Sequence, residues 1–145
     1  MTPRTRWILR GIALAALAGL AVSSLSLVQH WGREHTSYCD LGASFNCDIV
    51  NRSVYSAVMG IPVALIGMLG YLGLLGLATV YRSQAETPLM LLTGSLAGLG
   101  CALYLTYIER FVLATWCILC LSSLAAISAI AILSLSLVVA DRRRP

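Results

Sequence analysis

Charged side chains are scarce in this sequence. Asp, Glu, Lys and Arg make up 11% of its 145 residues, while 59% of the residues are hydrophobic. Soluble domains carry about 25% charged residues, so the composition excludes an ordinary soluble domain and predicts an integral membrane protein. The middle of each long apolar stretch also lacks ionisable residues. That argues against a transporter, which would be expected to place such groups at mid-membrane.

The sequence also lacks a low-complexity linker, a convincing internal repeat and an aromatic–basic surface. We therefore expect one domain over residues 1–145 and no nucleic-acid partner. The net charge of +4 comes largely from the two ends of the chain. It is interpreted as a signal for membrane topology and contact with the lipid bilayer.

Four stretches without Asp, Glu, Lys or Arg are long enough to cross a membrane, which takes roughly 17–25 residues. They predict an all-α bundle of four transmembrane helices with an external cysteine-containing loop as a cap. We place the spans at about residues 11–29, 54–81, 88–108 and 116–140. The external loop then covers residues 30–53.

Arginines orient these spans. Three precede the first helix, at Arg4, Arg6 and Arg10, and three more follow the last helix at residues 142–144. Because positive residues favour the cytoplasmic side, both termini are expected there in a multi-pass protein. The external loop and the turn near residues 109–115 then lie on the periplasmic or luminal face. A cleaved signal peptide is the alternative for the first helix; it would leave three spans and conflict with the terminal charges or the loop orientation.

Small residues recur at helical spacing in the second and third spans. Gly67, Gly70, Gly73 and Gly76 form one row, and Gly94 and Gly98 form a G-x-x-x-G. Small residues let membrane helices approach closely, so we expect these glycines to pack helix against helix. The stretch at residues 51–60 is expected to begin the second span.

The chain has five cysteines. Cys117 and Cys120 form a Cys-x-x-Cys at the predicted start of the fourth span, a spacing typical of redox-active pairs. A helix N-terminus stabilises a thiolate, so this pair suits disulfide exchange. Cys39 and Cys47 lie in the external loop, on the predicted oxidising side, where exposed cysteines are usually paired. Cys101 is expected to be an inert buried residue.

Two other interpretations of these cysteines stay open. Both pairs, or the loop pair alone, would be static disulfides in a structural or partner-binding membrane subunit. Alternatively, the four thiols would hold zinc, although their spacing and compartment disfavour a metal, and we expect none. His30 and His35 are assigned interfacial or solvated roles, and Glu109 with Arg110 is interpreted as an interfacial ion pair.

Taken together, these residues resemble the vitamin K epoxide reductase family in its bacterial, quinone-linked form. The resemblance rests on Tyr38-Cys39-Asp40, on Cys47 after seven residues and on Trp116-Cys117-Ile118-Leu119-Cys120. It also rests on Ser53-x-Tyr55-Ser56 leading into Gly60-Ile61-Pro62-Val63-Ala64. It extends over nearly the whole chain. The other four-helix class of quinone-linked disulfide-forming proteins carries its cysteine pairs in the opposite order.

The resemblance implies a four-helix bundle around a quinone and assigns a role to each cysteine. Cys120 lies next to the quinone, Cys117 exchanges with Cys47, and Cys39 exchanges with an external thioredoxin-like protein. Ser53 matches a position close to the quinone ring, and the expected quinone contacts are Ser53, Ser56, Trp116 and Cys120.

The chain departs from the family pattern in two respects. Animal members use an Asn and a Tyr to hydrogen-bond the quinone carbonyls, where this sequence has Ser56 and Leu124. Many bacterial members carry a fused thioredoxin-like domain. The resemblance in this sequence is to the membrane domain, so the redox partner is expected to be a separate protein. The predicted activity is a quinone-dependent disulfide oxidoreductase that supports disulfide bond formation. Vitamin K, menaquinone, ubiquinone or a quinone epoxide remains open as the acceptor.

Overall fold

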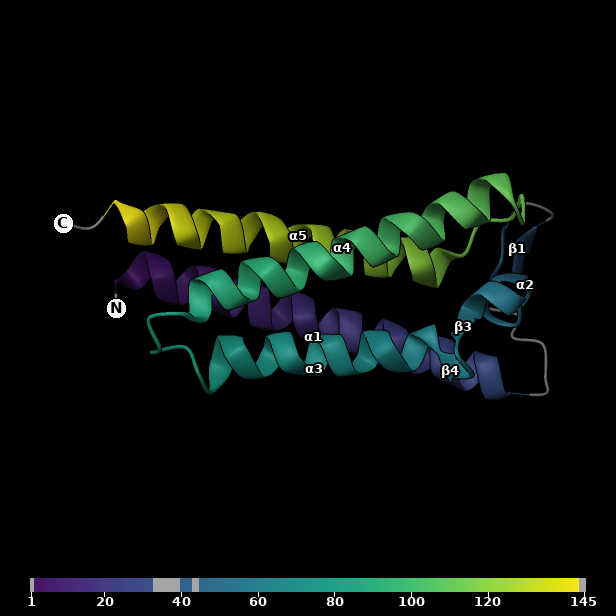
Figure 1. Ribbon diagram of the computed structural model, residues 1–145, viewed down its shortest axis with the longest axis horizontal. Coiled ribbons are helices and arrows are strands. Elements are labelled where there is room, and N and C mark those ends of the chain that lie inside the picture. The colour runs from purple at the N-terminus through teal and green to yellow at the C-terminus, as the bar shows by residue number, and fades with distance from the viewer. Residues whose placement is uncertain (1, 33–39, 43–44, 144–145) are drawn as a thin grey trace.

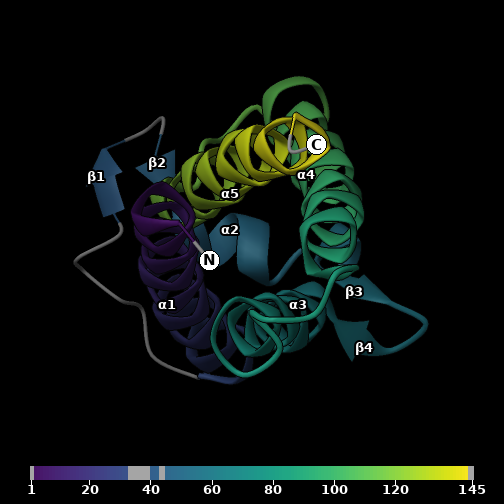
Figure 2. The same ribbon diagram turned by 90° about the vertical axis from the view of Figure 1, so that its left-hand side faces the viewer.

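The computed structural model describes residues 2–32, 40–42 and 45–143, and only the main chain of residues 40–42, 47 and 48. Within this part, the long helices are α1 (Pro3–Trp31), α3 (Val63–Thr79), α4 (Thr87–Phe111) and α5 (Ile118–Arg142). They run side by side as a bundle, with both termini at one end (Figure 1). Seen down the bundle, the four helices form a ring (Figure 2).

Three of the described helices, α1, α4 and α5, are long and apolar enough to cross a membrane. α3 is also apolar but has only 17 residues. Three of the four expected spans are therefore long enough to cross a membrane, and α3 is shorter. Large apolar side chains point outward on all sides, for example Leu14, Leu69 and Ile132. Such a surface suits lipid contact, because a water-soluble bundle would carry polar residues there.

The second predicted span begins nine residues later than residue 54. A 3₁₀ turn (Val54–Ser56) is followed by a hairpin of β3 (Ala57–Val58) and β4 (Ile61–Pro62), and α3 starts at Val63. The physical reason lies in the turn, where Met59 has φ 52° and Gly60 has φ 82°. Left-handed residues cannot continue a right-handed helix, and Pro62 provides no backbone N–H.

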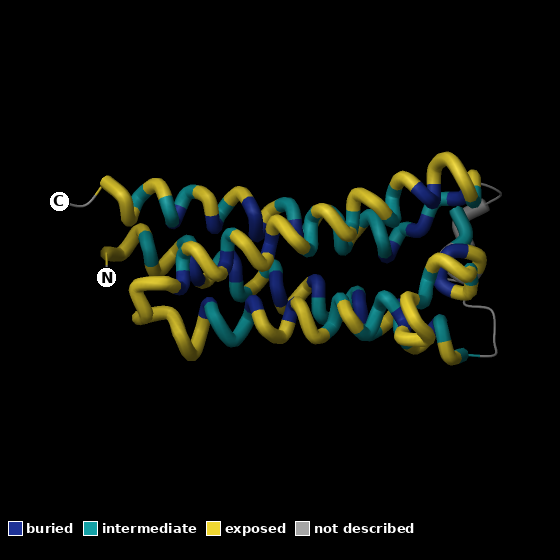
Figure 3. Tube along the Cα trace, viewed as in Figure 1, coloured by how far each residue is buried: buried dark blue, intermediate teal, exposed yellow. Residues whose placement is uncertain are grey.

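The core lies where the helices face each other (Figure 3). Ile12 of α1, Leu91 of α4 and Ile130 of α5 are completely buried at its centre. α1 packs along α3 and α5, and α4 packs along α5, whereas α3 and α4 contact each other much less. The bundle is therefore least tightly closed between α3 and α4.

The glycines divide into two groups. A Cβ atom added at Gly98 would lie 3.1 Å from Ile127, and one at Gly94 would lie 3.3 Å from Leu74. These two pack helix against helix, as expected. On α3, Gly67 also meets the expectation, because a Cβ there would lie 3.2 Å from Ser23 of α1, whereas a Cβ at Gly70 or Gly73 would meet nothing within 4 Å. Because these glycines have no side chain, open space remains along this face of α3.

The external loop folds back over the end of the bundle opposite the termini (Figure 1). Its described elements are the antiparallel pair β1 (Asp40–Gly42) and β2 (Phe45–Asn46), and the short helix α2 (Cys47–Asn51). Asn51 Nδ2 donates to Gln29 Oε1 at 2.7 Å, and both side chains are buried. This bond joins α2 to the last turn of α1 and positions it as a cap.

Candidate functional site

A cavity of about 570 Å³ lies inside the bundle, beneath α2 and between α1, α3, α4 and α5. Its wall is mainly apolar and includes Gly70 and Gly73 from the open row on α3. The few polar groups in the wall gather toward the capped end, where Asn51, Ser53 and Glu109 line it. An apolar chamber with a small number of polar groups is typical of a small-molecule site.

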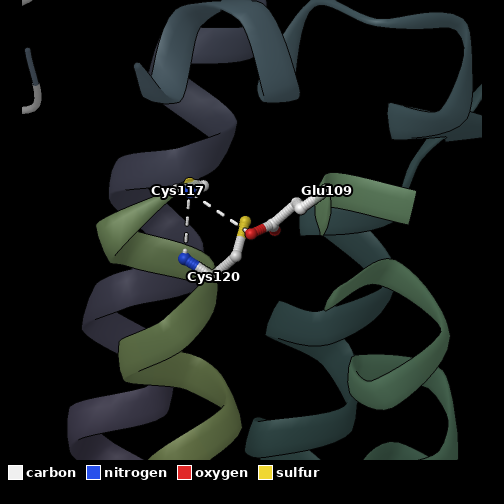
Figure 4. Close-up of side chains that lie close together, drawn as sticks. All are labelled: Glu109, Cys117 and Cys120. Atoms are coloured by element: carbon white, nitrogen blue, oxygen red, sulfur yellow. Dashed lines mark hydrogen bonds between the residues drawn. The ribbon is translucent and has the colours of Figure 1, made fainter. Parts of the chain in front are cut away.

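Cys117 and Cys120 lie at the entry of α5, at the capped end. Cys117 is the N-cap residue, and its Sγ accepts the Cys120 N–H at 3.4 Å (Figure 4). Cys117 is fully buried, whereas Cys120 lines the cavity. Both are free thiols. The pair thus has one sulfur facing the chamber and one behind it.

Hydrogen bonds to its sulfur favour the ionised form of Cys117. The Cys120 thiol has the largest effect and lowers the pKa of the Cys117 thiol, and the Cys120 N–H acts in the same direction. Burial and the nearby charge of Glu109 oppose these effects without cancelling them. A thiolate is the reactive form in disulfide exchange, so this lowered pKa favours exchange at Cys117.

Glu109 is a site residue that the sequence analysis missed. Its side chain is 1% exposed, and Oε2 accepts the Cys117 N–H at 3.2 Å (Figure 4). The expected interfacial ion pair with Arg110 is therefore wrong, because the carboxylate points into the site while Arg110 lies over the Phe111 ring. Eight residues separate Glu109 from Cys117, and the turn between α4 and α5 interrupts any helical or strand periodicity between them.

The turn between α4 and α5 brings Glu109 to Cys117. The Thr115 N–H donates to the Glu109 carbonyl at 3.0 Å, and Ala114 has a φ of 50°. This left-handed residue reverses the chain within a few residues, which returns it to the end of α4. The carboxylate can then reach the first residue before α5.

The loop cysteines are only partly covered by the structure. Cys39 lies outside the described residues, and the main chain of Cys47 begins α2. The Asn46 N–H donates to the Trp116 carbonyl at 3.1 Å, next to a parallel bridge between Phe45 and Trp116. The residues that follow these two hydrogen-bonded positions are Cys47 and Cys117. The backbone thus brings the start of α2 next to the Cys-x-x-Cys.

The residues expected to contact a quinone lie at the same end. Ser53 and Ser56 both line the cavity, and their hydroxyls donate to the carbonyls of Val50 and Ser53 at 2.8 and 2.7 Å. Trp116 is not part of the cavity wall among the described residues. Its main chain serves instead to join β2 to the start of α5.

His30 has partners that the sequence did not suggest. Its Nδ1 lies 2.6 Å from the Asn51 carbonyl oxygen and 3.2 Å from the Ser56 hydroxyl, and its side chain lines the cavity. A carbonyl oxygen only accepts, so Nδ1 carries the hydrogen, and Nε2 of the neutral ring is an acceptor. A solvated role without partners is therefore wrong for His30, and His35 lies outside the described residues.

Two further expectations about the cysteines can be compared with the structure. Cys101 is exposed on α4 and lines the cavity, so the expectation of a buried residue is wrong. The four-cysteine zinc alternative involves side chains outside the described residues. Within the described residues, the ligand atoms of Glu109, Cys117 and Cys120 lie within 4.8 Å of one another.

Among known protein families, the Vitamin K epoxide reductase family matches residues 11–135. The match covers both cysteine pairs, all of α3 and α4, and most of α1 and α5. A search of curated proteins gave no match. The apolar helices and this family agree in indicating a membrane oxidoreductase of thiols and disulfides. The chain belongs to the vitamin K epoxide reductase family.

Proposed function

We propose that the protein is a quinone-dependent thiol oxidase that passes electrons from external protein thiols to a quinone in the membrane. The observation that carries the proposal is a free dithiol at the wall of an apolar chamber of about 570 Å³. Drug-sized ligands occupy pockets of about 300–1,000 Å³, so the chamber has room for a quinone ring and part of its tail. A quinone accepts two electrons and two protons and becomes a quinol.

Electrons enter through the loop pair. A reduced thioredoxin-like partner exchanges with the Cys39–Cys47 disulfide, so the partner becomes oxidised and the loop becomes a dithiol. Cys47 then attacks Cys117 in the second disulfide, and Cys120 leaves as a thiol. Cys39 next attacks Cys47 in this mixed disulfide, which restores the Cys39–Cys47 disulfide and releases Cys117 as the second thiol of the inner pair. Support comes from the hydrogen bond between Asn46 and Trp116, each of which directly precedes one of the two reacting cysteines. Exchange through such mixed disulfides is the general route for protein thiols.

The dithiol at the start of α5 delivers the electrons to the quinone and closes to a disulfide. Cys120, which lines the chamber, is the sulfur at the quinone, and Cys117 forms the new S–S bond. Ser53 and Ser56 would contact the ring at the same end. Their hydroxyl hydrogens are engaged by main-chain carbonyls, so each offers oxygen lone pairs to a quinol hydroxyl.

The orientation follows from charge. Arginines at both ends of the chain put the termini in the cytoplasm, and the capped end then faces the periplasm or lumen, where disulfides form. We infer four spans, with α3 as the shortest. Its 17 residues rise about 25 Å, close to the roughly 30 Å of the hydrocarbon layer.

The second candidate is a membrane subunit with static disulfides. It predicts cysteines that stay oxidised under every quinone state and Cys→Ala changes that harm folding without affecting turnover. The presence of a chamber beside Cys120 favours the oxidase. A quinone epoxide as acceptor would use the same dithiol and the same chamber.

The experiment is turnover of purified protein with dithiothreitol or a reduced thioredoxin-like protein as donor, and ubiquinone or menaquinone as acceptor. Cys120→Ala is expected to abolish quinone reduction with either donor. Cys47→Ala is expected to abolish it chiefly with the protein donor, since a small thiol reaches the inner pair directly. Folded wild-type protein that reduces no quinone would overturn the proposal.

A further inference from the structure

We propose that Glu109 is the base that removes the proton of the Cys120 thiol and passes it into the cavity during quinone reduction. This inference rests on the proposed function and deepens it, because it assigns the proton route that an electron relay requires. It is carried by the position of the Glu109 carboxylate, which lies beside both cysteines (Figure 4) and lines the chamber together with Cys120.

The cost of burying Glu109 argues for a role beyond structure. The side chain is 1% exposed at the end of an apolar helix, and Oε1 has no hydrogen-bond partner within the described residues. Burial of a carboxylate is expensive, and in membrane segments such residues usually serve function. A neutral glutamine would accept the Cys117 N–H as well. The negative charge is therefore unnecessary for holding Cys117 in place.

The two carboxylate oxygens have different surroundings. Oε2 accepts the Cys117 N–H, which fixes the direction of the side chain. The carboxylate also interacts with the Cys120 thiol, and the ligand atoms of all three residues lie within 4.8 Å of one another. Glu109 and Cys120 both line the cavity. A proton taken from Cys120 is thus already at the chamber wall.

The proposed step balances in atoms and charge. The Cys120 S–H proton moves to the Glu109 carboxylate, and the resulting thiolate is the electron donor to the quinone. Cys117 then bonds to the Cys120 sulfur, so two S–H bonds break, one S–S bond forms and two electrons leave the protein. Glu109 releases its proton to one quinone oxygen and returns to the carboxylate. The proton of Cys117 supplies the other oxygen.

Among the described residues, the other titratable side chains in the chamber wall are His30, Tyr55, Tyr71 and Cys101, and two of them are already engaged. His30 Nδ1 is bound to the Asn51 carbonyl, and the Tyr71 hydroxyl is bound to Ser123. In the described part of the chain, the charged or titratable groups to consider around Glu109 are Cys117 and Cys120 from α5, His30 from α1, Tyr71 from α3 and Arg110 on its own helix. Glu109 is the carboxylate in this group, and we therefore assign the base to it.

The test separates the two half-reactions in the full-length protein. Glu109→Gln keeps an oxygen for the Cys117 N–H and removes the base. Single-turnover quinone reduction is expected to slow about 100-fold or more, which is the usual range for loss of a general base. Reduction of the inner disulfide by dithiothreitol and the Kd for quinone should stay within about twofold of wild type. Glu109→Asp keeps the carboxylate and should recover part of the rate.

Two further readouts distinguish a base from a structural residue. The wild-type rate of quinone reduction should fall on the acid side as the carboxylate is protonated, and this limb should be absent in Glu109→Gln. Without quinone, chemical reduction of the inner disulfide should perturb a carboxylate infrared band that the Gln variant lacks. Quinone reduction by Glu109→Gln at the wild-type rate would overturn the inference. If wild type itself reduces no quinone, the proposed function fails, while the infrared result still reports on the carboxylate–thiol contact.

Discussion

The open glycine row on α3 makes a quantitative prediction about the chamber. Gly73 lines the cavity, and a Cβ added there would meet no atom within 4 Å. Gly73→Leu would place four carbon atoms in the chamber and exclude about four carbons of a bound ligand. At about 0.8 kcal/mol per buried CH₂, binding weakens by about 3 kcal/mol, or about 100-fold in Kd.

Gly76 provides a matched control one helical turn away. A Cβ at Gly76 also meets nothing within 4 Å, but this residue is not part of the cavity wall among the described residues. Both substitutions replace Gly by Leu inside the same helix, so both gain the same helix propensity of under about 1 kcal/mol. Gly76→Leu should leave quinone affinity within about twofold of wild type.

The assay is equilibrium binding of a short-tailed naphthoquinone, measured by quenching of tryptophan fluorescence at one detergent concentration. Thermal melting of each variant checks folding. Wild-type affinity in Gly73→Leu, or an equal loss in both variants, would refute the assignment of the chamber as the quinone site.

Three other outcomes follow from the site. Cys120→Ala should move the pH midpoint for exchange of Cys117 with a small disulfide upward, because the Cys120 hydrogen bond lowers the pKa of Cys117. Cys120→Ser, whose hydroxyl can also donate, should move this midpoint less. Equal midpoints in wild type and Cys120→Ala would contradict the reasoning. Ala114→Gly should raise stability by about 1 kcal/mol, since Ala114 is left-handed, and an unchanged or lower melting temperature would count against it. His30→Ala should weaken the attachment of α2 to α1 and slow oxidation of a protein donor more than oxidation of dithiothreitol, whereas equal slowing would argue for a direct role at the quinone.

The sequence was sufficient to place Cys117 and Cys120 at a helix start. They lie three apart in the chain, so their position one turn apart follows from local geometry. Length and absence of charge also identified the apolar helices, because both are properties of a single segment. The family match is consistent with both features.

Features that depend on tertiary contacts could not be predicted in this way. Glu109 reaches the site only because the left-handed Ala114 turns the chain back, and one sequence gives no signal for that φ. The glycines on α3 recur at one spacing, yet a Cβ at Gly67 would meet Ser23 of α1, whereas a Cβ at Gly73 would enter the open chamber. Spacing identifies a face of small residues but not what lies opposite it.

The late start of α3 has a similar cause. Residues 54–62 are apolar enough to continue a span, but Met59 and Gly60 adopt left-handed conformations and form a hairpin. Gly and Pro residues are common in turns, while the lack of charge over the same stretch favoured a helix. Local backbone preference prevailed over hydropathy at this position.

The most direct test of the central claim is a single-turnover reaction of pre-reduced, purified protein with one equivalent of menaquinone or ubiquinone. Mass-tagged alkylation would follow the thiols, and absorbance would follow the quinone. The account predicts one quinol formed for each Cys117–Cys120 disulfide, with the same result in Cys47→Ala and no reaction in Cys120→Ala. Inner thiols that stay reduced beside bound quinone would contradict it.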